Sequence, residues 1–339
     1  MAYQNVGTPR FYINTLEWLA SNGVITLPSD HFRTLPVITK PIGTWNTIMD
    51  IEDGAGMTIP SGIFNNKCFF AALGHTYHTN SVEMNVYVGN SAAEVDWGDT
   101  QINVDAPNTD GDATATPPYD GFSLATLTNQ YFDIFAYNAA GECGSVIFGT
   151  YYDMPHSPDL NLTMTREYGG IKTIETKGGA SLSNDFGSSP PNWGELAAWQ
   201  IRDLNTMGED KIYKLSKSGR RIWQLSFSFL ADSSIFPLIS SLDAYESTSA
   251  DGEPFSAAYE DVEASTWQND NTILDSDNFY SQVIHKTNGG QLPFIFQPDG
   301  GANGNNNPDQ FAICKLSGFS FQQTAPNLYS VKMKIREVW

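Results

Sequence analysis

The residues with the clearest chemical potential are two histidines, His75 and His78, in the segment Leu73–His78. Imidazole is a common metal ligand, and two imidazoles could share one ion. Side chains three positions apart on a strand point to opposite faces, so a shared metal would require a turn at this point. We therefore expect structural histidines here.

Acidic residues gather in a second stretch, Asp96 to Asp112, whose carboxylate oxygens could bind Ca²⁺. The stretch lacks the ligand spacing and the terminal glutamate of an EF-hand loop. We expect a solvated surface loop, with an ordered calcium ion as the alternative. No cofactor and no required metal are expected anywhere in the chain.

Motifs of common enzyme sites do not occur in the sequence. There is no Gly-x-Ser-x-Gly, no glycine-rich phosphate-binding loop and no zincin helix. A pair of carboxylates like that of glycosidases is spatial, so the order of residues does not reveal one. We expect a protein without enzymatic activity and keep a glycan-cleaving enzyme as an alternative.

Two segments alternate strictly between apolar and polar residues, and both are expected to position the rest of the chain. The apolar residues are Trp223, Leu225, Phe227 and Phe229 in the first segment and Tyr329, Val331, Met333 and Ile335 in the second. A period of two predicts strands with one buried and one solvated face. We expect both strands in one antiparallel sheet.

The composition favours a mainly-β protein. Aromatic residues make up 13% of the chain and charged residues only 17%, whereas a helical bundle is richer in Ala, Leu, Glu and Lys. Short apolar runs separated by turn residues between residues 42 and 152 predict a jelly roll or β-sandwich.

The chain is expected to divide into three parts. Residues 1–28 are predicted to form an N-terminal helical arm, with Thr8 as N-cap, Pro9 in the first turn and Gly23 as the stop. Residues 29–155 form the predicted jelly roll. The proline-rich segment Asp153–Asp159 marks the boundary, because two prolines in four residues do not fit a central strand. Residues 156–339 form a second β-rich domain with a few short helices.

Charge and cysteine content narrow the expected partners and location. The net charge of −20 repels a phosphate backbone, so we expect no nucleic-acid partner. Three scattered cysteines, Cys68, Cys143 and Cys314, fit core positions in a reducing compartment better than a disulfide framework. The first residues have no apolar core of a signal peptide, and the longest apolar run is too short to span a bilayer, so we expect synthesis in a cytosol and no membrane partner.

One segment, Phe69-Phe70-Ala71-Ala72-Leu73-Gly74-His75-Thr76-Tyr77, followed by the strand pattern of residues 82–88, resembles discoidin-like jelly rolls in structural proteins of tailed bacteriophages. Thr76-Tyr77 stands where that family usually has an Asn. Residues 219–227, 292–299 and 329–339 are similar to segments of distal-tail and minor-tail proteins of such phages. The resemblance implies a virion component of the tail or tail adaptor, made in the host cytoplasm and assembled with copies of itself and other virion proteins. It implies no catalytic residues.

Aromatic and aliphatic residues supply the candidate contact sites. For assembly these are Phe11, Leu16, Trp18 and Leu19, because a short helix must pack against something, and Trp339, because an aromatic residue at the end of the closing strand is either buried or offered to a neighbour. The alternative is that arm and terminus fold back on their own chain. A carbohydrate-binding module that attaches to host surface glycans is the other functional hypothesis. Trp97 and Tyr119 are its candidates for stacking on sugar rings.

Overall fold

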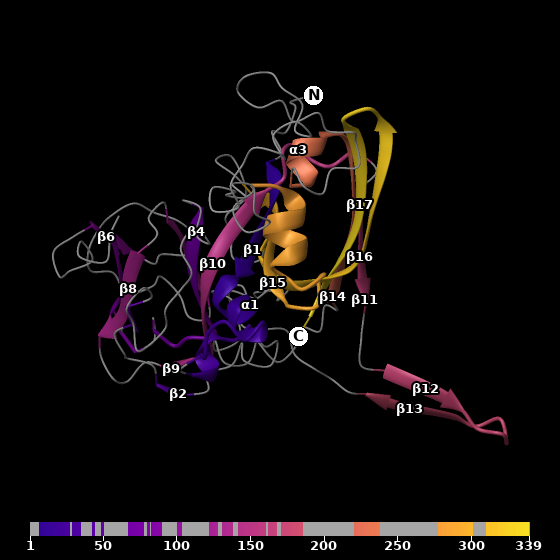
Figure 1. Cartoon of the computed structure of the whole chain (residues 1–339). Helices are drawn as coiled ribbons and strands as arrows, with labels where there is room; N and C mark the ends of the chain where they lie inside the picture. The colour runs from indigo at the N-terminus through magenta and orange to yellow at the C-terminus, as the bar shows by residue number, and fades with distance from the viewer. Residues whose placement is uncertain are drawn as a thin grey trace, which may run out of the picture.

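The structure, a computed structural model, describes residues 7–27, 29–34, 43–44, 49–50, 67–77, 80–81, 83–89, 100–103, 122–127, 131–137, 142–160, 162–167, 171–185, 220–237, 277–300 and 310–338. Antiparallel strands dominate these residues, and the helical segments are short (Figure 1). The expected mainly-β class is therefore confirmed.

A nine-stranded antiparallel sheet forms the body of the protein. Its order is β11 (Thr163–Glu167), β14 (Arg220–Ala231), β17 (Leu328–Glu337), β16 (Ala312–Ala325), β15 (Phe294–Gly300), β1 (Thr8–Asn14), β10 (Ser145–Asp153), β4 (Cys68–Leu73) and β7 (Phe122–Leu127). The two strands with the strict alternation, β14 and β17, are neighbours in this sheet, as expected.

A second sheet completes a jelly roll. Its order is β3 (Met49–Asp50), β8 (Tyr131–Tyr137), β5 (Glu83–Gly89) and β6 (Thr100–Asn103). The eight strands of the jelly roll are, in chain order, β1, β3, β4, β5, β6, β7, β8 and β10. When these strands are renumbered from 1 to 8, the large sheet contains them in the order 1-8-3-6 and the second sheet in the order 2-7-4-5. This interleaving is the strand order of a jelly roll. A short ladder joins β2 (Gly43–Thr44) to β9 (Glu142–Cys143).

The N-terminal segment differs from the predicted helical arm. Residues Thr8–Asn14 form strand β1, and the helix α1 (Thr15–Ser21) begins only after it. The true N-cap is Asn14, whose side-chain oxygen accepts a hydrogen bond from the Glu17 amide at 3.1 Å. Because β1 pairs with β10 on one side and β15 on the other, it supplies the first strand of the jelly roll and is no separate arm.

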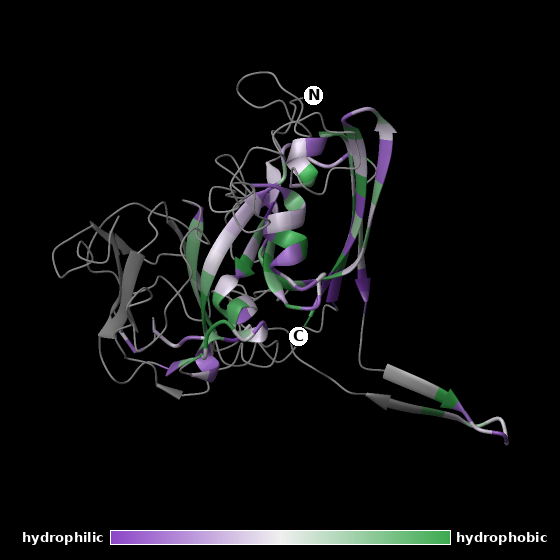
Figure 2. Ribbon diagram, viewed as in Figure 1, coloured by the Kyte–Doolittle hydropathy of each residue, from purple (hydrophilic) through white to green (hydrophobic). Residues whose placement is uncertain are grey.

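Packing on both faces of the sheet crosses the expected domain boundary near residue 155. On one face Phe11 and Ile13 pack with Tyr152 and with residues of β14 to β17. On the other face Tyr12 packs with residues of β4, β7 and β16. Apolar residues recur along these strands (Figure 2). Each hydrophobic cluster thus draws on residues from both sides of the boundary, so the sheet does not follow the predicted division.

Short helical segments pack against the sheet. The π-helix η6 (Tyr280–His285) places Val283 and Ile284 in the same cluster as Phe11. Besides α1, the other helices in the described residues are η1 (Asp30–Phe32) and α3 (Asp232–Ile235). Within the described residues, no helix combines the length and apolarity needed to cross a membrane.

A bulge interrupts the alternation of β14. Trp223, Leu225 and Phe227 are buried as predicted, but Phe229 is 79% exposed, and the next buried residue is Leu230. The pairing of β14 with β17 shifts between Phe227 and Leu230, and Phe229 has a φ of +61°. The predicted burial of Phe229 is wrong, because an extra residue in a strand reverses the side on which the following residues lie.

Candidate functional site

Four of the five residues that the sequence suggested for assembly are core residues. Phe11, Leu16, Trp18 and Leu19 are between 0 and 5% exposed within a single chain. Their side chains are buried between the sheet and the flanking helix, so they offer no surface to a neighbour. The expected assembly role of these four residues is therefore wrong. Trp339 lies outside the described residues, as do both suggested glycan-stacking residues, Trp97 and Tyr119.

The histidine pair and the acidic stretch do not form a site in the described part of the chain. His78 and most of the acidic stretch Asp96–Asp112 fall outside it. His75 is 1% exposed; its Nε2 lies 3.0 Å from the Ser123 hydroxyl, and its ring stacks on Tyr77. Because both residues are buried, neither solvent nor substrate reaches this Ser–His pair. This environment is typical of a structural histidine. Among the described residues, no three His, Cys, Asp or Glu side chains form a group that could hold a metal ion.

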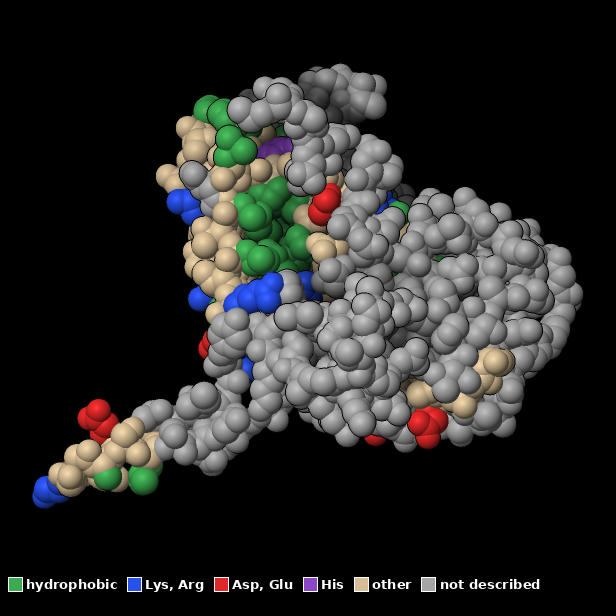
Figure 3. Space-filling model, turned by 180° about the vertical axis from the view of Figure 1, so that it is seen from behind, with side chains coloured by type: hydrophobic (Ala, Val, Ile, Leu, Met, Phe, Trp, Pro, Cys, Tyr) green, Lys and Arg blue, Asp and Glu red, His purple; other side chains and the backbone are tan. Residues whose placement is uncertain are grey.

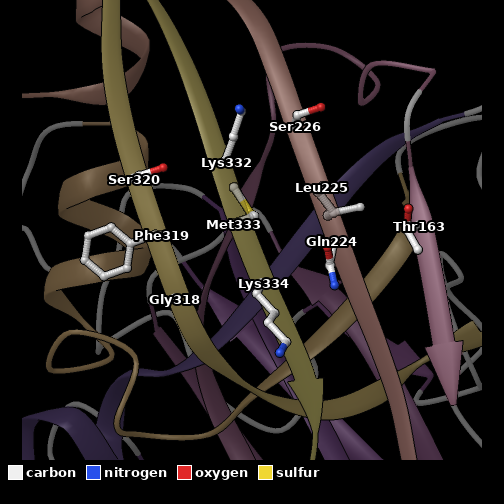
Figure 4. A pocket seen from close by; sticks show the side chains of 10 residues that line it. All are labelled: Thr163, Gln224, Leu225, Ser226, Gly318, Phe319, Ser320, Lys332, Met333 and Lys334. Carbon is white, nitrogen blue, oxygen red and sulfur yellow. The ribbon is translucent and has the colours of Figure 1, made fainter. Parts of the chain in front are cut away.

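A hollow of about 520 Å³ lies on the polar face of β11, β14, β17 and β16 (Figure 4). Two cross-strand rows line it. One row is Ser226, Lys332 and Ser320; the other is Thr163, Gln224, Lys334 and Gly318. These rows follow from the period of two, which turns the apolar residues of the same strands to the opposite face.

Hydrogen-bond donors and positive charge characterise this hollow. Lys332 and Lys334 are both exposed, and no carboxylate is among the described residues that line it. The adjacent Arg336 is already paired with Glu167 at 2.7 Å. In a chain of net charge −20 the hollow is therefore a local cationic, hydroxyl-lined surface. It can bind polar or anionic groups.

A second surface, the apolar edge, consists of Leu160, Leu162, Met164 and Phe229. Their exposed fractions are 105%, 47%, 47% and 79%. Three of them follow one another with a period of two into β11, which is the last strand at its end of the sheet; no described strand pairs with its outer side. As far as the described residues go, its outer backbone groups are open to another strand.

Asp159 fixes the geometry of the apolar edge. Its carboxylate accepts hydrogen bonds from the Ser228 amide at 3.2 Å and the Ser228 hydroxyl at 2.8 Å. Its own amide donates to the Ser226 carbonyl at 2.8 Å. These contacts hold the bulge that turns Phe229 outward, next to the segment that begins at Leu160. A left-handed backbone at a phenylalanine is uncommon and is maintained only where surrounding contacts impose it.

The third feature is the hairpin of β12 (Ile171–Glu175) and β13 (Ser181–Asp185), which lies apart from the body (Figure 1). Ile174 and Leu182 are directly paired across it and are 55% and 61% exposed. Hydrophobic side chains are visible on its surface in Figure 3. The turn is closed by the Thr176 and Ala180 backbone groups, with Gly179 at a φ of +79°, as the Gly178-Gly179 pair predicts.

The sequence predicted the strands on which these surfaces lie, but it did not predict that their side chains form exposed surfaces. The alternation of Leu160, Leu162 and Met164 indicates a strand, but nothing local distinguishes an edge strand from a buried one. No protein-family model matches the chain, and no curated protein sequence matches it.

Proposed function

We propose that the protein is a structural component of a bacteriophage virion, associated with the tail or its adaptor, and that it acts through protein–protein assembly. The observation that carries the proposal is the distribution of exposed large hydrophobic side chains. Six of the eight in the described residues lie on the apolar edge or on the hairpin that follows it.

This distribution of exposed hydrophobic side chains indicates a binding surface for another protein. Contiguous exposed apolar groups on a folded protein mark interaction sites. An isolated two-stranded hairpin is at best marginally stable in water, so a hairpin that lies apart from its own sheet calls for a partner. The virion setting is supported by the resemblance of several segments to tail proteins and by the jelly-roll strand order.

Purified particles test this proposal. Virions from a host lysate that contains the gene product are banded by density, and the protein is quantified by mass spectrometry against the major capsid protein. A virion component is expected at a fixed ratio in every fraction that contains intact particles. Recovery of the protein only in the unsedimented lysate, with a known capsid protein in the band as control, would contradict the proposal.

The cationic hollow supports a second candidate function, the binding of host surface glycans. Hydroxyl, amide and ammonium groups line one surface there (Figure 4), and Lys332 and Lys334 favour sugars that carry negative charge. A glycan array probed with the purified protein tests this. The double variant Lys332→Ala/Lys334→Ala should lose binding, whereas Lys177→Ala at the exposed hairpin turn should retain it. Equal binding by both variants, or none by the wild type, argues against a glycan site here.

A further inference from the structure

We infer that the hairpin β12–β13 of one copy docks on the apolar edge of a second copy of this chain. This inference rests on the proposed assembly function and names its partner and its contact. Each copy would give its hairpin to one neighbour and receive the hairpin of another.

The receiving surface has both components that strand addition requires. Addition of a strand to a sheet uses the free backbone groups of the edge for affinity and alternate side chains for specificity. All five residues of β11 are exposed. The first part of the edge, from Leu160 to Met164, contains neither proline nor charge, the two devices that commonly protect an edge strand, whereas Arg166 and Glu167 at the end of β11 are charged.

The donated element matches this edge in length and in character. β11, β12 and β13 are each five residues long. The apolar pair Ile174 and Leu182 corresponds to the exposed Leu162 and Met164 of the edge. The small residues Gly178, Gly179 and Ala180 are at its turn, where contact with the edge would end.

A second copy, and not the same chain, is the occupant that the topology favours. Only residues 168–170 separate β11 from β12, yet within the described residues β12 pairs with β13 and not with β11. With respect to the described part of the chain, both surfaces therefore stay exposed on each molecule. Such a contact joins two different patches and generates rings or filaments by repetition.

The hairpin is locally neutral, although the whole chain is strongly acidic. It contains Lys172, Glu175, Lys177 and Asp185, so two positive charges balance two negative ones. Two copies with a net charge of −20 each repel one another at long range, so apolar side chains and backbone groups must supply the attraction. Lys332 and Lys334 lie on the sheet face opposite Leu162 and Met164, because Thr163, which lines the hollow, alternates with these two residues along β11.

Complementation between two inactive variants tests the inference. The hairpin variant is Ile174→Glu/Leu182→Glu and the edge variant is Leu162→Glu/Met164→Glu; all four side chains are exposed, so circular dichroism should remain that of the wild type. In sedimentation velocity at tens of micromolar, wild type is expected to form oligomers and each variant to stay monomeric. An equimolar mixture should give dimers only, because one intact hairpin meets one intact edge.

The controls separate this contact from general stickiness and from the virion proposal. Val24→Glu changes an exposed apolar residue elsewhere and should leave the oligomers intact. If glutamates disturb folding, serine at the same four positions carries the same test. A monomeric wild type, oligomeric variants or a mixture without dimers would each overturn the inference. If the protein is found in virions although the mixture stays monomeric, only this contact is wrong.

Discussion

At the scale of single residues, Arg221 and Glu337 show how the interior of an acidic protein accommodates charge. Their side chains are 3% and 1% exposed, and the guanidinium and carboxylate meet at 3.1 Å. The carboxylate also accepts the Arg221 amide at 2.8 Å, and the guanidinium donates to the Phe311 carbonyl at 2.8 Å. The pair joins the beginning of β14 to the end of β17 and satisfies its own hydrogen bonds.

Removal of one member of this pair should be strongly destabilising. In Glu337→Ala the buried guanidinium loses its carboxylate, and breaking such a pair lowers the free energy of unfolding by about 3–5 kcal/mol. Urea titration followed by tryptophan fluorescence measures the change. The matched control is Glu167→Ala, which breaks the exposed pair with Arg336 and should change the free energy of unfolding by at most about 1 kcal/mol. Equal effects of the two substitutions would contradict the role of burial.

The three cysteines offer a test of the core that involves no substitution. All are free and buried. Burial raises the pKa of Cys68 and Cys143 to about 12 and that of Cys314 well above its ordinary value. At pH 8 the thiols are therefore neutral as well as inaccessible, and thiolate is the form that reacts with disulfide reagents. Native protein is expected to react slowly with Ellman's reagent and to release all three thiols in denaturant. Rapid reaction of native protein would show that one of these sites is open.

The error at Phe229 shows where residue-level prediction ends. Alternation correctly identified Trp223, Leu225 and Phe227 as buried, because each follows the pleat of a regular strand. The bulge after Phe227 depends on Asp159, 69 positions away in the chain. A contact between such distant residues leaves no trace in a local pattern, so the exposed phenylalanine, and the apolar edge with it, could not be predicted.

At the scale of elements, β1 is the segment on which local signals and tertiary context disagree most. Thr8 and Pro9 are typical of the beginning of a helix, yet the continuous apolar run from Phe11 to Ile13 lies between β10 and β15 with both of its faces buried. Proline is tolerated near the beginning of a strand. The predicted end of the helix was correct, because α1 ends shortly before Gly23, which has a φ of +73°.

The close approach of β1 to β10 makes Gly149 a sensitive position. A Cβ at this residue would overlap the Ile13 carbonyl oxygen and lie 2.6 Å from the Thr15 amide nitrogen, and these are backbone atoms that cannot rotate away. Gly149→Ala should therefore lower the melting temperature by many degrees or prevent folding. Gly318→Ala is the matched control, because a Cβ there has no atom within 4 Å. Similar melting temperatures for both variants would mean that β1 does not lie against β10 as described.

At the scale of the whole molecule, the sequence predicted the jelly roll correctly, but it did not predict that the jelly roll and the C-terminal strands share one sheet. The spacing of apolar runs correctly indicated a jelly roll, because each run is a strand whose length and turns are set locally. The proline-rich segment near Asp153 correctly marks the end of β10. It does not separate two cores, because β15 returns from the C-terminal part to pair with β1 and extends the jelly-roll sheet by five strands.

Expression of the two parts tests whether this shared sheet is obligatory. Residues 160–339 alone lack Phe11, Ile13, Tyr152 and Met154, which pack in the same cluster as the residues of β14 to β17. This fragment should show no cooperative urea unfolding by itself, whereas co-expression with residues 1–159 should restore a soluble complex. A Gly-Ser insertion after Gly178, in the exposed hairpin turn, controls for general sensitivity and should leave folding unchanged. If the isolated fragment instead unfolds cooperatively with the stability of the intact chain, each part has its own core, and the division after residue 155 is correct although the sheet is continuous.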